Sequence, residues 1–126
     1  MGSFQSFEEL ACWKEARNLR NFVRNLIIKN FPNSERFELT SQIKRSARSV
    51  GNNIAEGFGR YNFQENIQFC RIARGSLNET LDHAIIALDE SYISKEDLKE
   101  LRVIHDKTLL ILNGYIKYLK GQKNKK

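Results

Sequence analysis

The residues best suited to chemistry in this sequence are clustered lysines and arginines. Lys44, Arg45 and Arg48 lie close together in the segment IKRSARS, where positions three or four apart share one face of a helix. Arginine stays charged at physiological pH, and its planar guanidinium donates paired hydrogen bonds to phosphate oxygens. The cluster therefore predicts a phosphate-binding surface. The alternative is a solvated face whose charges are balanced by nearby acids.

Three further groups of cations extend this prediction, each with the same alternative. Arg60 follows the first cluster, and the neighbouring Tyr61 offers a ring on which a base can stack. Arg71 and Arg74 lie on one helix face, and Arg74 occupies an apolar position of a seven-residue repeat. We expect Arg74 to snorkel, to pair with an acid such as Glu56, or to face a central channel. The last group is a stripe on the first helical segment, formed by Arg17, Arg20 and Arg24.

The sequence offers little for catalysis or metal binding. His105 falls in an apolar helical repeat, which is typical of a hydrogen-bonded core histidine, whereas His83 follows Asp82 and is expected to be exposed. Cys12 and Cys70 are far apart and fit reduced, buried thiols. No spacing of these residues matches a zinc or di-iron signature. We therefore expect no enzymatic activity, no cofactor and no metal.

Composition bounds the class of protein. The chain has 126 residues, a formal net charge of +6 and a single proline, which fits one domain. The positive charge favours acidic partners, nucleic acid before an anionic surface. No apolar run approaches the roughly 20 residues of a membrane span, and no basic-then-apolar leader opens the sequence. We expect a cytoplasmic protein without a membrane partner.

Apolar residues recur at helical spacing in four segments, and no stretch alternates as a strand does. The predicted helices cover residues 7–30, 39–58, 63–90 and 95–120, and a basic tail, 121–126, follows. Four amphipathic helices joined by short loops predict an all-α, antiparallel, up-down four-helix bundle in which residues 1–126 form a single domain. The first and third helices carry more apolar surface than one core needs, so we expect copies of the chain to form a homo-oligomer.

The helix predicted over residues 39–58 also carries a line of small polar side chains. Its members are Gln42, Ser46, Ser49 and Asn53. Small side chains allow another helix to approach closely, and amides can bond across the seam; the alternative is a solvated face with nothing opposite it. Asn53 and Glu56 are expected to link a neighbouring backbone or subunit. Gly51 weakens the helix by about 1 kcal/mol relative to alanine and predicts a bend or the close approach of another backbone.

The stretch LTSQIKRSARSVGNNIAEGFGR, residues 39–60, resembles the signature of the four-helix bundle proteins encoded by intervening sequences of 23S rRNA genes. The opening F-x-x-L-x-x-W-x-x-A pattern and the segment ARGSLNET are also similar to that family, so the likeness covers nearly the whole chain. Gly51 stands where the family usually has proline, and Arg48 where an apolar residue is common. The matching positions include Gln42, Arg45, Ser49, Asn53, Glu56, Gly57 and Arg60.

The resemblance implies an assembly and a function. Members form antiparallel four-helix bundles, and relatives that serve as accessory proteins of diversity-generating retroelements assemble as barrel-like pentamers. Those relatives bind nucleic acid and a reverse transcriptase through basic surfaces. By resemblance we expect a homopentameric ring that binds RNA or DNA without catalysis, although the spare apolar surface fits a dimer equally well. The alternative is a structural or protein-interaction scaffold that docks a partner such as a reverse transcriptase, with no nucleic-acid role of its own.

Overall fold

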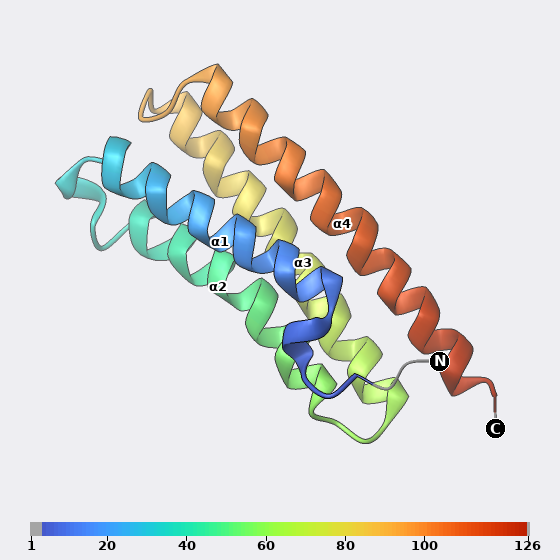
Figure 1. Cartoon of the computed structure of the whole chain (residues 1–126). Coiled ribbons are helices and arrows are strands. Elements are labelled where there is room, and N and C mark those ends of the chain that lie inside the picture. Colours follow the sequence, from blue (N-terminus) through green and yellow to red (C-terminus); the bar gives the residue numbers. More distant parts are fainter. Residues whose placement is uncertain (1–3, 126) are drawn as a thin grey trace.

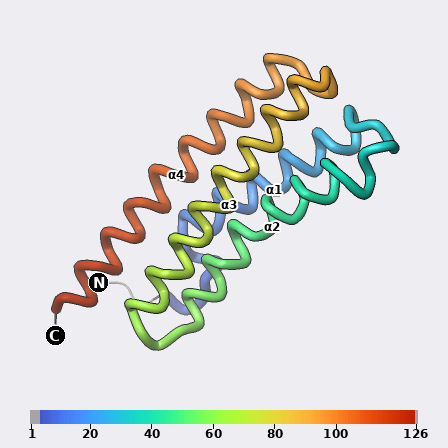
Figure 2. The backbone as a smooth tube through the Cα atoms, turned by 180° about the vertical axis from the view of Figure 1, so that it is seen from behind, coloured from blue at the N-terminus to red at the C-terminus, as the bar shows by residue number. Residues whose placement is uncertain are grey.

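The computed structural model describes residues 4–125, which form four long helices and no strand. Figures 1 and 2 show the chain running along the bundle and turning back at each loop, so that the first and the last helical segments of the chain begin and end, respectively, at the same end of the molecule. The prediction of an all-α, single-domain fold is confirmed for these residues, while residues 1–3 and 126 lie outside the described part. The long helices are α1 (Ala11–Asn30), α2 (Leu39–Phe58), α3 (Phe63–Asp89) and α4 (Lys95–Lys123).

Each long helix packs on two neighbours around a shared apolar core. α2 lies between α1 and α3, α4 also contacts α1 and α3, and the closest pairing is that of α2 with α3. The core consists of the apolar faces that the helical periodicity predicts, because burying those faces is the main favourable term in folding. The largest side chains with no exposed surface are Leu19, Val50, Ile54, Leu77, Leu101 and Leu112.

The start of the first helix differs from the prediction. A short 3₁₀ helix, η1 (Phe7–Glu9), comes first, and α1 begins only at Ala11. The Ser6 hydroxyl accepts a hydrogen bond from the backbone N–H of Glu8, and Leu10 is extended and buried between η1 and α1. The Phe7 ring consequently packs edge-on against Trp13, with 5.1 Å between ring centroids. Burial of Leu10 thus overrides the continuous helical pattern.

The other predicted helix bounds agree with the structure or differ by a few residues. α2 covers 39–58 as predicted, and α3 ends one residue early, before a loop in which Ser91 adopts a left-handed backbone with φ of 65°. α4 begins with a capping box, in which the Ser94 hydroxyl and the Asp97 carboxylate bond each other's backbone N–H. α4 continues through Lys123, so the first residues of the predicted tail are helical.

The expected surplus of apolar surface is largely covered within the chain on α1. Trp13, Phe22 and Ile27 are half-buried against the core, because α1 packs on both α2 and α4. Large apolar side chains that remain exposed include Ile28 on α1, Ile72 on α3, and Val103 and Leu110 on α4. None of the helices in the described part of the chain is long and apolar enough to cross a membrane.

Gly51 provides room for the only tryptophan. α2 passes through Gly51 without interruption, and a Cβ atom at this position would lie 3.4 Å from the indole Nε1 of Trp13. The close neighbour of Gly51 is therefore a side chain of α1 and not the backbone that was expected. The Arg17 guanidinium lies 5.9 Å from the indole ring centroid, at a distance where a cation interacts favourably with an aromatic face.

Candidate functional site

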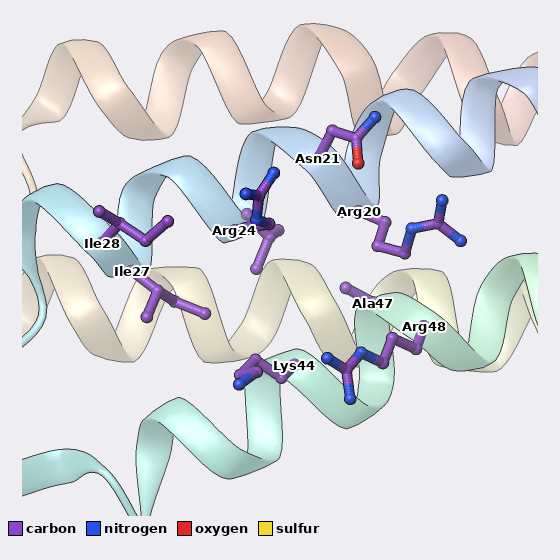
Figure 3. Close-up of a pocket in the computed structure, with 9 residues that line it drawn as sticks. Arg20, Asn21, Arg24, Ile27, Ile28, Lys44, Ala47 and Arg48 are labelled. Carbon is purple, nitrogen blue, oxygen red and sulfur yellow. The ribbon is translucent and has the colours of Figure 1, made fainter.

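Four cations from two helices surround a groove between α1 and α2. This interhelical groove has a volume of about 290 Å³ and contains the apolar side chains of Val23, Ile27 and Ala47. Its remaining lining includes the cations Arg20 and Arg24 from α1 and Lys44 and Arg48 from α2. Figure 3 shows these side chains gathered along the facing sides of the two helices.

No acid balances this cluster. No aspartate or glutamate lines the interhelical groove, and within residues 4–125 none of the four cations forms an ion pair. Residues 10–60, which span α1 and α2, hold ten lysines and arginines against four acids, so their formal charge equals the +6 of the whole chain. Like charges around one groove repel each other, and a bound anion relieves that repulsion.

A second, wider groove continues from the first over the outer side of α2. This outer groove has a volume of about 660 Å³ and shares Lys44 and Arg48 with the interhelical groove. Two more cations, Arg36 and Arg45, line it, together with hydroxyl and amide side chains that can donate hydrogen bonds. We refer to the six cations as the basic face: Arg20, Arg24, Arg36, Lys44, Arg45 and Arg48.

The structure does not bring the other predicted cations to this face. Arg60 lies at the far end of α2, about 18 Å along the helix from Arg48 at 1.5 Å per residue, and its guanidinium pairs with Glu56 at 2.8 Å. Arg74 donates a 2.7 Å hydrogen bond to the Asn113 amide oxygen on α4 rather than pairing with Glu56. Arg71 is exposed on α3.

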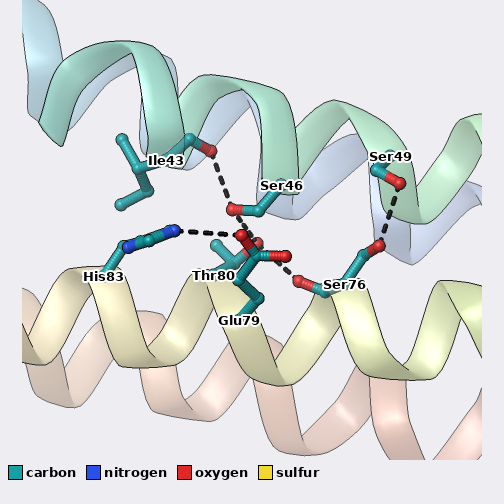
Figure 4. A network of polar contacts seen from close by, with 7 residues as sticks. All are labelled: Ile43, Ser46, Ser49, Ser76, Glu79, Thr80 and His83. Atoms are coloured by element: carbon teal, nitrogen blue, oxygen red, sulfur yellow. Dashed lines mark hydrogen bonds and ion pairs between the residues drawn. The ribbon is translucent and has the colours of Figure 1, made fainter. Parts of the chain in front are cut away.

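Two members of the predicted line of small polar residues face α3 of the same chain. Ser46 and Ser49 on α2 each bond a hydroxyl on α3 at 2.9 Å, from Thr80 and Ser76 respectively. Figure 4 shows this row of contacts between the two helices. Asn53 donates to the Ser49 backbone oxygen and hydroxyl within α2. Of the two alternatives for Ser46 and Ser49, the close approach of another helix is therefore confirmed, and a solvated face with nothing opposite it is not found.

The remaining motif residues have different surroundings. Gln42 is exposed on α2, and Glu56 pairs with Arg60, two residues after the end of α2. Gly57 is buried where α2 meets α3, and a Cβ atom there would lie 2.6 Å from the Asn66 amide oxygen and 2.9 Å from the Phe69 Cβ. Such distances are too short for any side chain, so the motif glycine permits the tight α2–α3 packing.

The cross-helix bonds lead to a stability prediction. Thr80→Val removes the hydroxyl that bonds Ser46 but keeps the side-chain shape, and we expect the free energy of unfolding to fall by about 1 kcal/mol. Thr108→Val is the matched control, because Thr108 is also fully buried and bonds only the Ile104 backbone oxygen of its own helix. Urea unfolding measures both variants. Equal losses in the two would show that the α2–α3 bond contributes no net stability.

Comparison with known protein families shows the family to which this chain belongs. A family model for 23S rRNA-intervening sequence proteins matches residues 8–114. The chain belongs to this family. The matched range contains α1, α2 and α3, most of α4 and all of the basic face. A search among curated proteins finds no match.

The histidines and cysteines of this 23S rRNA-intervening sequence protein lie away from the basic face. His105 is buried and bonds the Asn78 and Asp106 side-chain oxygens at 2.9 Å each, as expected of a core histidine. The expected exposure of His83 is wrong: only 8% of it is exposed, and its Nε2 lies 3.2 Å from a Glu79 carboxylate oxygen. The close packing of α2 on α3 encloses the ring.

Burial makes the two thiols unreactive. Burial is the main cause that raises the pKa of Cys12 and of Cys70 to about 12, so both remain protonated at neutral pH, and a thiol is a poor nucleophile in that form. Both are free cysteines. Across residues 4–125, no group of three or more histidine, cysteine, aspartate or glutamate side chains is placed to hold a metal ion.

Three of the six cations of the basic face, Lys44, Arg45 and Arg48, form one cluster in the sequence, and the other three join them only in the folded chain. Arg20 and Arg24 were expected only as a separate stripe on the first helix, and Arg36 was not considered. The signal that relates them to Lys44 and Arg48 is the rotation of α1: its buried side places Arg20 and Arg24 toward α2. The half-buried Ile27, three residues after Arg24, marks that side of the helix in the sequence.

Proposed function

We propose that this 23S rRNA-intervening sequence protein is a non-catalytic, homo-oligomeric protein of the cytoplasm that binds the phosphate backbone of RNA or DNA through its basic face. The observation that carries the proposal is the cluster of Arg20, Arg24, Lys44 and Arg48 around a groove that contains no acid. Sequence-independent binding of nucleic acid is dominated by such cations, which replace the counterions condensed on the phosphates.

The polar part of the outer groove supports the same function. Hydroxyl and amide groups commonly donate hydrogen bonds to phosphate and sugar oxygens, and these contacts position a protein without reading sequence. Ser41, Asn52 and Asn53 lie beside the α2 cations in this groove. Neither groove contains a histidine, cysteine or carboxylate, so the lining provides binding groups rather than the acid–base pairs that catalysis requires.

Self-association is supported by exposed apolar surface. Val103 and Leu110 are 65% and 74% exposed and lie seven residues apart on α4, and the exposed Gly114 follows four residues later. Such a line fits the contact surface of another helix. The family resemblance favours a ring of five subunits, each of which is an antiparallel four-helix bundle. A ring would repeat the basic face in every subunit and strengthen the field that attracts a polyanion.

Titration of the purified protein with labelled RNA and DNA tests the binding proposal. We expect saturable binding at low salt that weakens steeply as salt increases, because each phosphate contact releases counterions. Light scattering on the same sample measures the number of subunits. Absence of binding at low salt would reject nucleic acid as the ligand. Capture of a partner protein that survives nuclease treatment would instead favour the scaffold function.

A further inference from the structure

An exposed aromatic side chain stands at one end of the outer groove. Phe37 is 82% exposed and lines this groove together with Arg36 and the α2 cations. A phenylalanine with so little buried surface adds little to folding, because hydrophobic stabilisation follows the apolar area removed from water. The side chain is therefore free to contact a ligand that occupies the groove.

The loop holds Phe37 in a defined place. The Arg36 guanidinium lies 5.2 Å from the Phe37 ring centroid, where a cation–aromatic contact is favourable. Just before it, the Glu35 carboxylate accepts hydrogen bonds from the Leu39 backbone N–H at 3.1 Å and the Tyr92 hydroxyl at 2.7 Å. These two bonds lower the pKa of Glu35, the Tyr92 bond being the larger cause, and they fix the loop against both α2 and the α3–α4 connection.

From Phe37 the outer groove runs along α2, where side chains that donate hydrogen bonds line it on successive helical turns. Lys44 and Arg45 come first, then Arg48, then Asn52, each about one helical turn further along. From Ser41 to Asn52 the helix rises about 16 Å at 1.5 Å per residue. That length matches about five phosphates of a strand whose stacked bases are about 3.4 Å apart.

We infer that the outer groove binds single-stranded nucleic acid, with its phosphates on Lys44, Arg45 and Arg48 and one unstacked base on the Phe37 ring. This inference rests on the proposed function and adds the strand state of the ligand. In a duplex the bases are stacked on each other and their faces are closed to side chains. In a single strand they are open to aromatic rings, which bind every base type because all bases have a π-face.

Fluorescence anisotropy with a labelled single strand, and with the duplex of the same length, tests the inference. We expect Phe37→Ala to weaken single-strand binding by roughly fivefold or more, as expected for loss of one base–aromatic stack, and to leave duplex binding unchanged. Tyr61→Ala is the matched control, since Tyr61, the other aromatic ring that the sequence offers for stacking, is fully exposed just after the opposite end of α2 and does not line the outer groove. It should change neither affinity. RNA and DNA versions of the strand show which sugar is preferred.

A second variant at the same position measures base stacking directly by fluorescence. We expect Phe37→Trp to keep wild-type affinity and to show indole fluorescence that a single strand quenches and an abasic strand of equal length does not. If Phe37→Ala lowers both affinities equally, or neither while binding itself persists, the stacking inference is wrong. If the wild-type protein binds no nucleic acid at low salt, the proposed function fails instead.

Discussion

The variant in which Arg20, Arg24, Lys44 and Arg48 are all replaced by glutamine is expected to lose nucleic-acid affinity by about 10⁴-fold at low salt. The reason is counterion release: each phosphate contact contributes roughly tenfold to affinity near 50 mM salt, and four contacts are removed. The slope of log affinity against log salt should fall by about three to four for the same reason. Anisotropy titrations across a salt series measure both quantities.

A charge-matched control separates a local site from the overall positive charge. Lys95, Lys99, Arg102 and Lys120 are all exposed on α4, and replacing these four by glutamine removes the same total charge. We expect this control variant to bind within a few-fold of wild type. Comparable losses in the two variants would mean that the basic face is not the binding site, and that net charge alone attracts the ligand.

Gly57→Ala is expected to lower the free energy of unfolding by about 1–3 kcal/mol. The added Cβ would meet the Asn66 amide oxygen at 2.6 Å and the Phe69 Cβ at 2.9 Å, so α2 and α3 would have to separate. Overpacking of this kind forces backbone shifts that cost about 1–3 kcal/mol. Displacing the buried Asn66 also weakens its 3.3 Å hydrogen bond to the Tyr115 hydroxyl.

Gly114→Ala is the matched control, and it is expected to raise the stability that Gly57→Ala lowers. Gly114 is exposed inside α4, and an added Cβ would have no neighbour within 4 Å. Because alanine is a better helix former than glycine, the free energy of unfolding of this variant should increase by about 0.5–1 kcal/mol. Chemical denaturation of the two variants provides the comparison. A Gly57→Ala protein as stable as wild type would show that α2 and α3 are less tightly packed than the structure indicates.

Helix positions in this protein were predictable from sequence, and helix partners were not. Apolar spacing located α2 to the residue because Leu39, Ile43 and Ile54 face one core and the terminal glycines end the pattern. Spacing does not encode which flank of a helix meets which neighbour. The rotation that places Arg20 and Arg24 beside Lys44 therefore became visible only in the folded bundle.

The same limit explains the errors around His83 and the motif residues. A polar line of serines is compatible with water or with another helix, and only packing decides between them. Here Gly57, Ser46 and Ser49 let α3 approach α2, and this approach encloses His83 even though Asp82 next to it is exposed. Neighbouring residues on a helix point about 100° apart, so the exposure of one says little about the other.

The start of α1 and the end of α4 lie at the end of the bundle opposite the loop that carries Phe37 (Figure 1). The two regions are separated by about the length of α2, roughly 30 Å for 20 residues. An affinity tag or a surface tether attached at either terminus is therefore placed away from Phe37 and the outer groove. Sensor-chip measurements on protein tethered by its N- or C-terminus should consequently report the same affinity as measurements on free protein.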